Sequence, residues 1–198
     1  MLLIGLTGSI AMGKSTVGGM LPALGAPMFD SDAAVHAFYR SAEARRVDAE
    51  FPGVLHDGVV DRRKLAQYVL DNDAAMARLE AIVHPIVEAA RANFLREAMG
   101  RATRVVIDSP LLLETGAGRS VDLIVVVSAP AAVQKARAMA RPGMTPKRFE
   151  SILARQMPDQ EKRRRAHFVV DTSGSLAATQ AQARDLMRCT AGMTGRSH

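Results

Sequence analysis

The chain carries five short apolar runs, separated by longer stretches in which apolar and polar residues alternate with helical spacing. The runs are residues 2–6, 26–29, 104–108, 122–127 and 168–170. A nearly continuous apolar run is typical of a strand that is covered on both faces, as in a parallel sheet with helices on either side. We therefore predict an α/β fold in which these runs are the strands of a parallel sheet.

Helical stretches lie between and after these runs. They cover residues 15–24, 33–50, 62–70, 74–99 and 131–140, a segment opened by Thr145-Pro146, and residues 176–189, with a loop at 51–61. Pro85, after His84, is expected to interrupt the fourth of them, because proline lacks an N–H. The block between the second and third strands is too large for a simple crossover. We therefore predict a core of residues 1–32 and 101–198, and a helical insertion at 33–100 that binds a substrate.

The first strand leads into Gly8-Ser9-Ile10-Ala11-Met12-Gly13-Lys14-Ser15, which fits the phosphate-loop pattern G-x-x-x-x-G-K-[ST] without deviation. Such a loop wraps a polyphosphate in backbone N–H groups, and its glycines allow a sharp bend and a close approach. Lys14 is predicted to reach the β- and γ-phosphates, and Ser15 to offer its hydroxyl to Mg²⁺. The alternative, a chance glycine loop, is disfavoured because the strand, loop and helix come in the required order.

Two further strands deliver carboxylates. The third ends at Asp108, a position from which an acid reaches Mg²⁺ directly or through water in nucleotide-binding folds. The second is followed by Asp30-Ser31-Asp32 at the carboxyl edge of the sheet, where open α/β folds build their sites, so Asp32 is a candidate base. The alternative is that one of these three residues caps the next helix. Spacing alone weighs the two equally.

Composition agrees with one enzyme domain of 198 residues, 48% of them hydrophobic. No apolar run approaches the roughly 20 residues of a membrane span, and the N-terminus has no signal-peptide pattern, so a cytoplasmic protein without a membrane partner is expected. The lone cysteine, Cys189, is interpreted as structural or incidental, and Cys/His metal clusters are lacking.

The formal charge of +6 permits either nucleic acid or small polyphosphates as partners. Aromatic residues make up 4% of the chain and do not interleave with the basic groups, and no recognition motif accompanies them. We therefore expect no nucleic-acid partner. The basic run at residues 162–165 is interpreted as a solvated helix face.

Taken together, these pieces resemble the dephospho-coenzyme A kinase family over Leu3 to about Leu186. The matching pieces are Gly5-Leu6-Thr7-Gly8 through Thr16, Asp30-Ser31-Asp32, residues 79–86 with His84-Pro85, Asp108-Ser109-Pro110-Leu111-Leu112 with Glu114, Gln156-Met157-Pro158, and Asp171-Thr172-Ser173-Gly174. The family, similar to nucleoside monophosphate kinases, performs the last step of coenzyme A synthesis. The resemblance implies a P-loop kinase fold with a five-stranded parallel sheet, a helical acceptor domain, and a mobile lid at about residues 141–165.

The resemblance also implies a reaction, in which the γ-phosphoryl group of ATP passes to the ribose 3′-hydroxyl of dephospho-coenzyme A. Asp32 and Lys14 are the implied catalytic residues, and Ser15 and Asp108 the implied Mg²⁺ ligands. The implied ATP-binding residues are Ala11, Met12, Gly13, Lys14, Ser15, Thr16 and Arg141. His84 belongs to a family signature, and either a substrate contact or a structural hydrogen bond at the helix kink explains it. The oligomeric state stays open.

The chain departs from the family pattern at two positions. Ala11 stands where the family usually has glycine, which stiffens the loop without removing a ligand. Thr172 replaces the asparagine usual after Asp171, so the adenine contact expected there stays open. Arg137 lies four residues before Arg141 on the same helix face, and for Arg137 a nucleotide contact and a surface charge are weighed equally.

Two rival classes of function share the phosphate loop. A regulatory GTPase needs an N-K-x-D motif, which the sequence lacks, and a D-x-x-G switch soon after the loop, whereas Asp171 to Gly174 follow the last strand. Another small-molecule kinase of the same fold is the stronger rival, because a fold does not fix the acceptor.

Overall fold

A computed structural model describes residues 1–70 and 72–196 of the chain. The chain divides into two compact units. We call Met1–Phe29 together with Ala98–His198 the core unit, and Asp30–Glu97 the helical unit.

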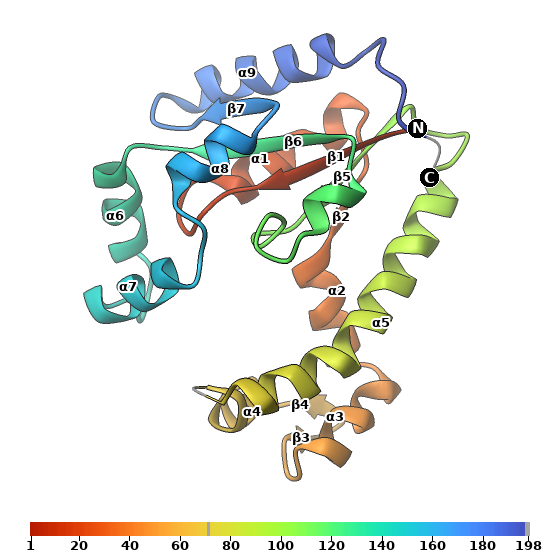
Figure 1. Cartoon of the computed structure of the whole chain (residues 1–198), viewed down its shortest axis with the longest axis vertical. Coiled ribbons are helices and arrows are strands. Elements are labelled where there is room, and N and C mark those ends of the chain that lie inside the picture. The colour runs from red at the N-terminus through yellow and green to blue at the C-terminus, as the bar shows by residue number, and fades with distance from the viewer. Residues whose placement is uncertain (71, 197–198) are drawn as a thin grey trace. The chain divides into compact units, whose positions relative to one another are not determined.

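The main sheet has five strands in the order β2-β5-β1-β6-β7. The strands are β1 (Leu2–Thr7), β2 (Met28–Asp30), β5 (Arg104–Asp108), β6 (Leu123–Ser128) and β7 (Phe168–Asp171). β1 pairs in parallel with both β5 and β6, and β6 pairs in parallel with β7, and Figure 1 shows β1 between its two partners. The predicted parallel sheet is confirmed, with the phosphate loop leaving the carboxyl end of its central strand.

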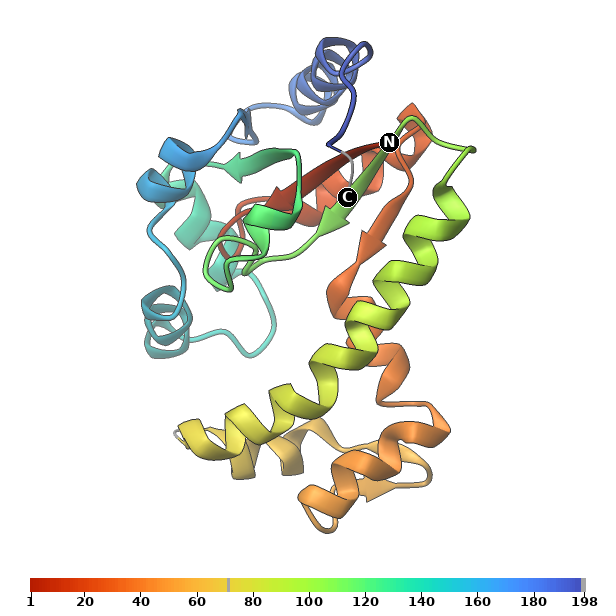
Figure 2. The ribbon, with the colours of Figure 1, turned by 45° about the vertical axis from the view of Figure 1, so that its right-hand side comes forward.

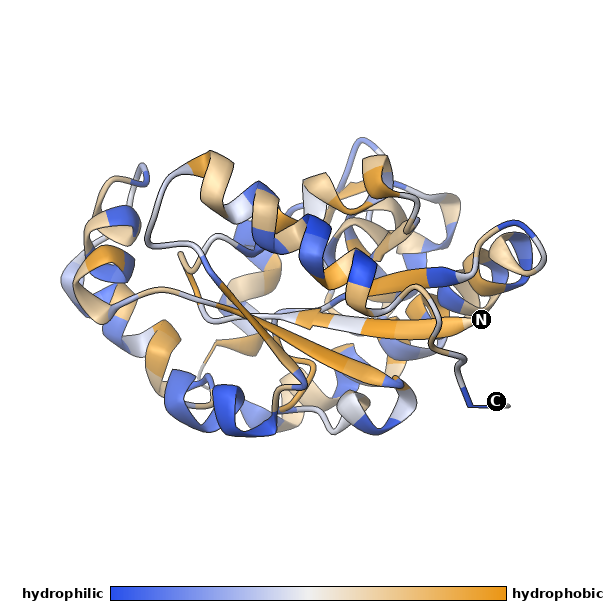
Figure 3. Ribbon diagram, turned by 90° about the horizontal axis from the view of Figure 1, so that it is seen from above, coloured by the Kyte–Doolittle hydropathy of each residue, from blue (hydrophilic) through white to orange (hydrophobic). Residues whose placement is uncertain are grey.

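Both faces of β1 are buried, as its continuous apolar run predicts. Leu2, Ile4 and Leu6 belong to the cluster that joins one face of the sheet to α1 (Lys14–Met20) and α9 (Leu176–Cys189). On the other face Gly5 packs closely, because a Cβ there would stand 2.5 Å from a methyl carbon of Leu112, which would have to shift. Figure 3 shows the strands of the sheet as predominantly hydrophobic.

The helices of the core unit are α1 (Lys14–Met20), α6 (Ala131–Met139), α7 (Pro146–Ala154), α8 (Asp159–Arg165) and α9 (Leu176–Cys189), with 3-10 turns at Pro22–Leu24 and Ala117–Ser120. α1 follows the phosphate loop, whereas α8 contacts β6 and α9 contacts β7. Thr145 caps α7 as predicted, because its Oγ1 accepts a hydrogen bond from Arg148 N at 3.2 Å and Pro146 occupies the first turn.

The helical unit has its own hydrophobic core. Its elements are α2 (Ser31–Phe38), a 3-10 turn at Ala42–Ala44, α3 (Arg45–Glu50), β3 (Leu55–His56), β4 (Val59–Val60), α4 (Arg62–Val69) and α5 (Asp73–Ala98). Phe38, Val47, Phe51, Leu65 and Leu79 are buried together in that core. Figure 2 shows α3, α4 and the small hairpin gathered around the amino-terminal half of α5.

Three local predictions in this unit are wrong. The helix expected over 33–50 breaks after Phe38, because Ser41 starts a new turn by accepting a hydrogen bond from Glu43 N. The segment 51–61, expected to be a loop, contains the hairpin of β3 and β4. Its two-residue turn has Asp57 at φ +49° and Gly58 at φ +79°, as a type I′ turn requires.

The third error concerns Pro85, which lies inside a continuous α5. Proline removes one backbone hydrogen bond of the helix. Leu79 and Val83 before it are buried in the core, and Ile86 and Val87 after it pack against the same cluster. Packing on both sides of Pro85 therefore holds the helix together across it.

Candidate functional site

Close contacts and unusual backbone angles shape the loop between β1 and α1. Gly8 lies so near the β6 backbone that a Cβ would stand 2.7 Å from the carbonyl oxygen of Val127. Gly13 has φ +89° and Ala11 has φ +60°, both in the left-handed region that favours glycine. Gly8 therefore permits a close approach of the backbone and Gly13 a sharp bend, as the spacing of the motif predicts.

Lys14, the first residue of α1, forms an ion pair with Asp108, the last residue of β5. The Lys14 Nζ atom lies 2.7 Å from Oδ1 and 2.8 Å from Oδ2 of Asp108, whose side chain is 5% exposed. The sheet register sets Asp108 beside Leu6, just before the loop begins. Pairing of neighbouring strands thus brings together the lysine predicted to bind phosphate and the carboxylate predicted to bind metal.

Two cavities border the phosphate loop. One of about 320 Å³ is lined by residues 8–15 with Pro110, Arg141, Ile152 and Gln156. The other, of about 330 Å³, is lined by Ala11, Gly13, Ser15, Thr16, Arg137, Arg141, Thr172, Gly174, Leu176 and Thr179. Every residue predicted to bind ATP therefore lines at least one of them, and Arg141 lines both.

Arg137 is a partly buried side chain that is held by Thr172. Its guanidinium donates hydrogen bonds to Thr172 Oγ1 at 2.9 Å and to the Thr172 carbonyl oxygen at 2.6 Å. The Thr172 hydroxyl donates in turn to the carbonyl oxygen of Met12 at 2.7 Å. This chain of contacts ties α6 to the phosphate loop and engages the hydroxyl that replaces the asparagine of the family pattern.

Asp30 caps α2. Its Oδ1 atom accepts a hydrogen bond from Ala33 N at 2.9 Å, whereas Ser31 and Asp32 already lie inside the helix as its first two residues. Within the part of the chain that the structure describes, no hydrogen bond or ion pair engages the Asp32 carboxylate. Among the three residues that the sequence offers as caps, Asp30 therefore has that role.

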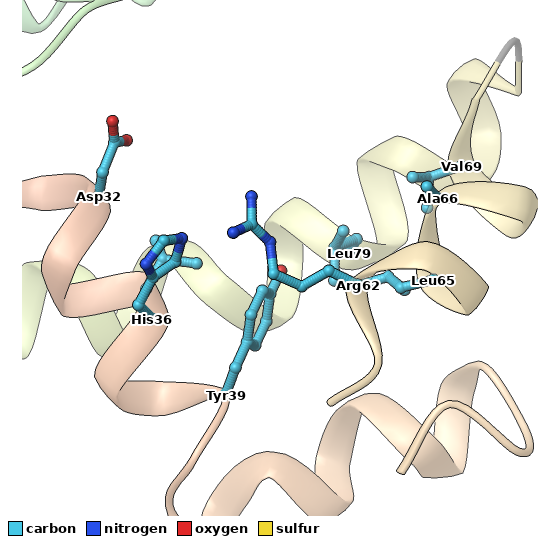
Figure 4. Close-up of a pocket in the computed structure, with 9 residues that line it drawn as sticks. Asp32, His36, Tyr39, Arg62, Leu65, Ala66, Val69 and Leu79 are labelled. Carbon is cyan, nitrogen blue, oxygen red and sulfur yellow. The ribbon is translucent and has the colours of Figure 1, made fainter. Parts of the chain in front are cut away.

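Asp32 lines a cavity of about 450 Å³ within the helical unit (Figure 4). His36, one turn further along α2, lines it too, and Arg62 from the start of α4 turns its guanidinium group toward the α2 side. Apolar side chains that include Leu65 and Leu79 complete the wall. Burial raises the pKa of the Tyr39 phenol at this cavity, and the Arg62 charge opposes that shift. The cavity thus joins a carboxylate, a guanidinium and an apolar wall.

His84 is exposed on α5 and is not among the residues that line this cavity. Its predicted contact with substrate therefore stays a prediction.

The prediction for Lys162 is wrong. The side chain, interpreted with residues 163–165 as a solvated face, is 0% exposed and pairs with Glu114 at 2.8 Å, while residues 163–165 are exposed. A buried ammonium group requires a carboxylate partner, and Glu114 is distant in sequence, so composition alone gave no signal for it. Glu114 and Gln156 appear in the matched motifs, but their contacts also depend on the fold.

Within the described residues, no group of three or more His, Cys, Asp or Glu side chains is arranged to hold a metal ion. None of the described helices combines the length and the apolar character of a membrane span.

Comparison with known proteins shows similarity along nearly the whole chain. The family model described as Dephospho-CoA kinase matches residues 2–178. A protein of Mesorhizobium japonicum named Dephospho-CoA kinase is 51% identical over 183 residues, which are 92% of this chain and 93% of the relative. One from Rhodopseudomonas palustris (strain HaA2), of the same name, is 48% identical over 197 residues, 99% of each chain.

Solved structures agree with this similarity. TT1252 from Thermus thermophilus superposes with a TM-score of 0.82 at 34% identity, covering 98% of each chain. A dephospho-CoA kinase from Campylobacter jejuni has a TM-score of 0.64 at 21% identity, covering 94% of this chain and 95% of its own. Shikimate kinase from Aquifex aeolicus reaches 0.54 at 16% identity, covering 98% of this chain and 100% of its own. The last two show a shared fold.

Proposed function

The chain belongs to the dephospho-CoA kinase family, and from this premise we propose that it transfers the γ-phosphoryl group of ATP to the ribose 3′-hydroxyl of dephospho-CoA. The product is coenzyme A, so the reaction is the last step of its biosynthesis. One observation carries the proposal for this chain: the complete phosphate loop lines a cavity, and its lysine is held against the carboxylate that ends the neighbouring strand.

Phosphoryl transfer through a loose transition state depends on positioning and on neutralising charge. In our proposal Lys14 leaves Asp108 when ATP binds and moves to the β- and γ-phosphates, where its charge stabilises the transferring group. Backbone N–H groups of residues 11–16 hold the phosphates, and Arg141 binds the nucleotide from the start of the lid. Support comes from the cavities at the loop, which these residues line.

The donors around the loop suit Mg²⁺, an ion that usually keeps several waters and takes one or two protein oxygens in addition to substrate phosphates. We assign the protein oxygens to the Ser15 hydroxyl and the Asp108 carboxylate, which becomes available when Lys14 turns to the phosphates. A cluster of three acidic or histidine ligands is not required for such a site. When bound, the ion neutralises charge on the phosphate oxygens and orients them for transfer.

The acceptor is assigned to the helical unit. There the cavity offers Arg62 for a phosphate group, an apolar wall, and Asp32 as the base that accepts or orients the proton of the attacking hydroxyl. The solvent-accessible carboxylate of Asp32, which is not needed as a helix cap, supports this role. We therefore propose that the predicted insertion at 33–100 binds dephospho-CoA.

A substrate panel tests the proposal. ADP release is measured with Mg²⁺ and ATP against dephospho-CoA, shikimate and nucleoside monophosphates, and the product with dephospho-CoA is analysed for a 3′-phosphate. We expect turnover with dephospho-CoA and formation of coenzyme A. Turnover with another acceptor and none with dephospho-CoA would assign the chain to the rival class, a small-molecule kinase of the same fold.

A further inference from the structure

The ammonium group of Lys162 is the point from which a network around the nucleotide cavity extends. The side chain is 0% exposed, in the middle of α8. Its Nζ atom lies 2.8 Å from Glu114 Oε1 and donates a hydrogen bond to the carbonyl oxygen of Pro110 at 3.1 Å. An ammonium ion is strongly disfavoured in a protein interior unless it is paired and hydrogen-bonded, so these two contacts are the condition for its burial.

Both partners of Lys162 lie on the segment that follows β5, which we call the β5 loop (residues 109–116). This loop begins directly after Asp108, and Pro110 lines the cavity over the phosphate loop. The carbonyl oxygen of Pro110 also accepts a hydrogen bond from Thr7 Oγ1 at 3.2 Å. Lys162 and Thr7 therefore fix the same peptide group, two residues from the Asp108 carboxylate.

The network continues into the segment that joins α7 to α8. Glu114 Oε1, which pairs with Lys162, also accepts a hydrogen bond from Met157 N at 2.8 Å. The adjacent side chain, Gln156, accepts one from Ile10 N in the phosphate loop at 2.9 Å. Successive residues between α7 and α8 are thus tied to the β5 loop and to the phosphate loop.

A contribution to stability alone is a weak explanation for this pair. Replacing a buried ion pair with neutral groups of similar volume is often neutral or stabilising, because the charges must be removed from water. Glu114 even retains an Oε2 atom that is buried and without a hydrogen-bond partner among the described residues. The pair does, however, join α8 to two segments that border one cavity, the β5 loop and the segment between α7 and α8.

We propose that Lys162 is a positioning residue for phosphoryl transfer, acting through Pro110 and Glu114 on the β5 loop and through Met157 and Gln156 on the phosphate loop. This role rests on the proposed function, because transfer at the phosphate loop is the step that it positions. Small displacements of reacting groups lower the rate steeply, by up to roughly 100-fold for about 1 Å. Loss of the network is therefore expected to lower kcat strongly while the melting temperature changes little.

The test uses the double variant Lys162→Met with Glu114→Gln in the full chain. It removes both buried charges together, so neither a lone ammonium group nor a lone carboxylate stays buried. We expect a melting temperature close to that of the wild type, a kcat for dephospho-CoA phosphorylation lower by roughly 10- to 100-fold, and an unchanged KM for dephospho-CoA.

Two control variants separate positioning from folding. Arg104→Met removes hydrogen bonds to Thr190 Oγ1 and to the Met187 carbonyl oxygen at the end of β5 opposite to Asp108. Any change in kcat of this variant therefore reflects a change in stability. Arg165→Met removes the exposed ion pair with Glu161 on the same α8 helix. We expect both controls to keep the kcat of the wild type at temperatures where they are folded.

Hydrogen exchange provides a readout without substrates. We expect the amides of Ile10 and Met157 to lose protection in the double variant and to keep it in Arg104→Met. If the double variant does not fold, the same measurements are made on Lys162→Gln with Glu114→Gln, which keeps a hydrogen-bond donor at position 162. A smaller loss of kcat is then expected.

The outcomes distinguish the two proposals. A folded double variant with the kcat of the wild type, or with unchanged protection of Ile10 and Met157, overturns the role of Lys162 while the proposed function stands. A wild type that does not phosphorylate dephospho-CoA overturns the proposed function and the positioning role together.

Discussion

Replacing Asp32 with asparagine separates catalysis from helix capping, because the two roles fall on different residues of the same strand end. Asp30 accepts the capping hydrogen bond from Ala33 N at 2.9 Å, and Asp32 lies in the first turn and lines the cavity of the helical unit. Asparagine keeps the size of the side chain but cannot take up the proton of a hydroxyl. Asp32→Asn is therefore expected to remove the proposed base and leave the cap intact.

The expected magnitudes differ enough to be told apart. Removing the cap with Asp30→Ala is expected to cost about 1 kcal/mol, which corresponds to a melting temperature lower by about 2–4 °C in a chain of this size. Asp32→Asn loses only the interaction of a negative charge with the start of a helix, about 0.3–1 kcal/mol. Phosphoryl transfer, by contrast, is expected to fall by roughly 100-fold or more in Asp32→Asn, the usual effect of losing a positioned base.

Single-turnover transfer at saturating ATP and dephospho-CoA measures the chemical step, and thermal melting of each variant measures stability. Asp30→Asn is the matched control, because asparagine caps a helix about as well as aspartate, and we expect it to change transfer and melting little. Normal transfer by a folded Asp32→Asn protein would refute the reasoning. The base would then have to be sought elsewhere, with Asp108 as the next candidate.

Three further predictions concern charged groups in the two units. Lys14→Ala is expected to lose nearly all transfer, because the charge beside the γ-phosphate is gone, and near-normal turnover in a steady-state assay would contradict the phosphate-loop assignment. Arg62→Met is expected to raise the KM for dephospho-CoA by roughly tenfold with little change in the KM for ATP, and the exposed substitution Arg63→Met serves as its control. Backbone N–H groups of Arg63 and Lys64 hold the pKa of Asp61 below its ordinary value of 3.8, so its carboxylate stabilises α4 above that pH and loses this effect as the pH falls through the lower, folded-state pKa. Melting of wild type and Asp61→Asn between about pH 5 and pH 3 should show the wild type losing its advantage, and a pH-independent difference would contradict this.

Much of the core unit could be predicted because its signals are local. A continuous apolar run such as that of β1 has few alternatives to a buried strand, and Thr145-Pro146 marks a helix start by the chemistry of two adjacent residues. The residues of the phosphate loop are likewise contiguous, so the motif alone identifies them. Between residues 38 and 45 the Ser41 cap competes with continuation of the helix, and the apolar pattern did not distinguish these two outcomes.

The parts of the site that the sequence did not predict depend on contacts between distant segments. The burial of Lys162 requires Glu114 and the Pro110 carbonyl oxygen to meet it, and no pattern within the basic run distinguishes Lys162 from its exposed neighbours. The cap of α2 was uncertain for a different reason. Asp30, Ser31 and Asp32 all cap well, and only the backbone at the end of β2 decides between them.

The two departures from the family pattern act at the same place. Ala11 holds φ +60°, which costs roughly 1–2 kcal/mol for a residue with a Cβ, but its methyl group is buried against Ala138 and Phe149, and burial of one such group contributes about 0.8 kcal/mol. Thr172 bridges Arg137 and the carbonyl oxygen of Met12. Ala138 and Arg137 are neighbours on α6, so both side chains connect the phosphate loop to the helix that precedes the predicted lid. The effects of Ala11 and Thr172 should therefore be coupled, because both side chains hold the phosphate loop against α6.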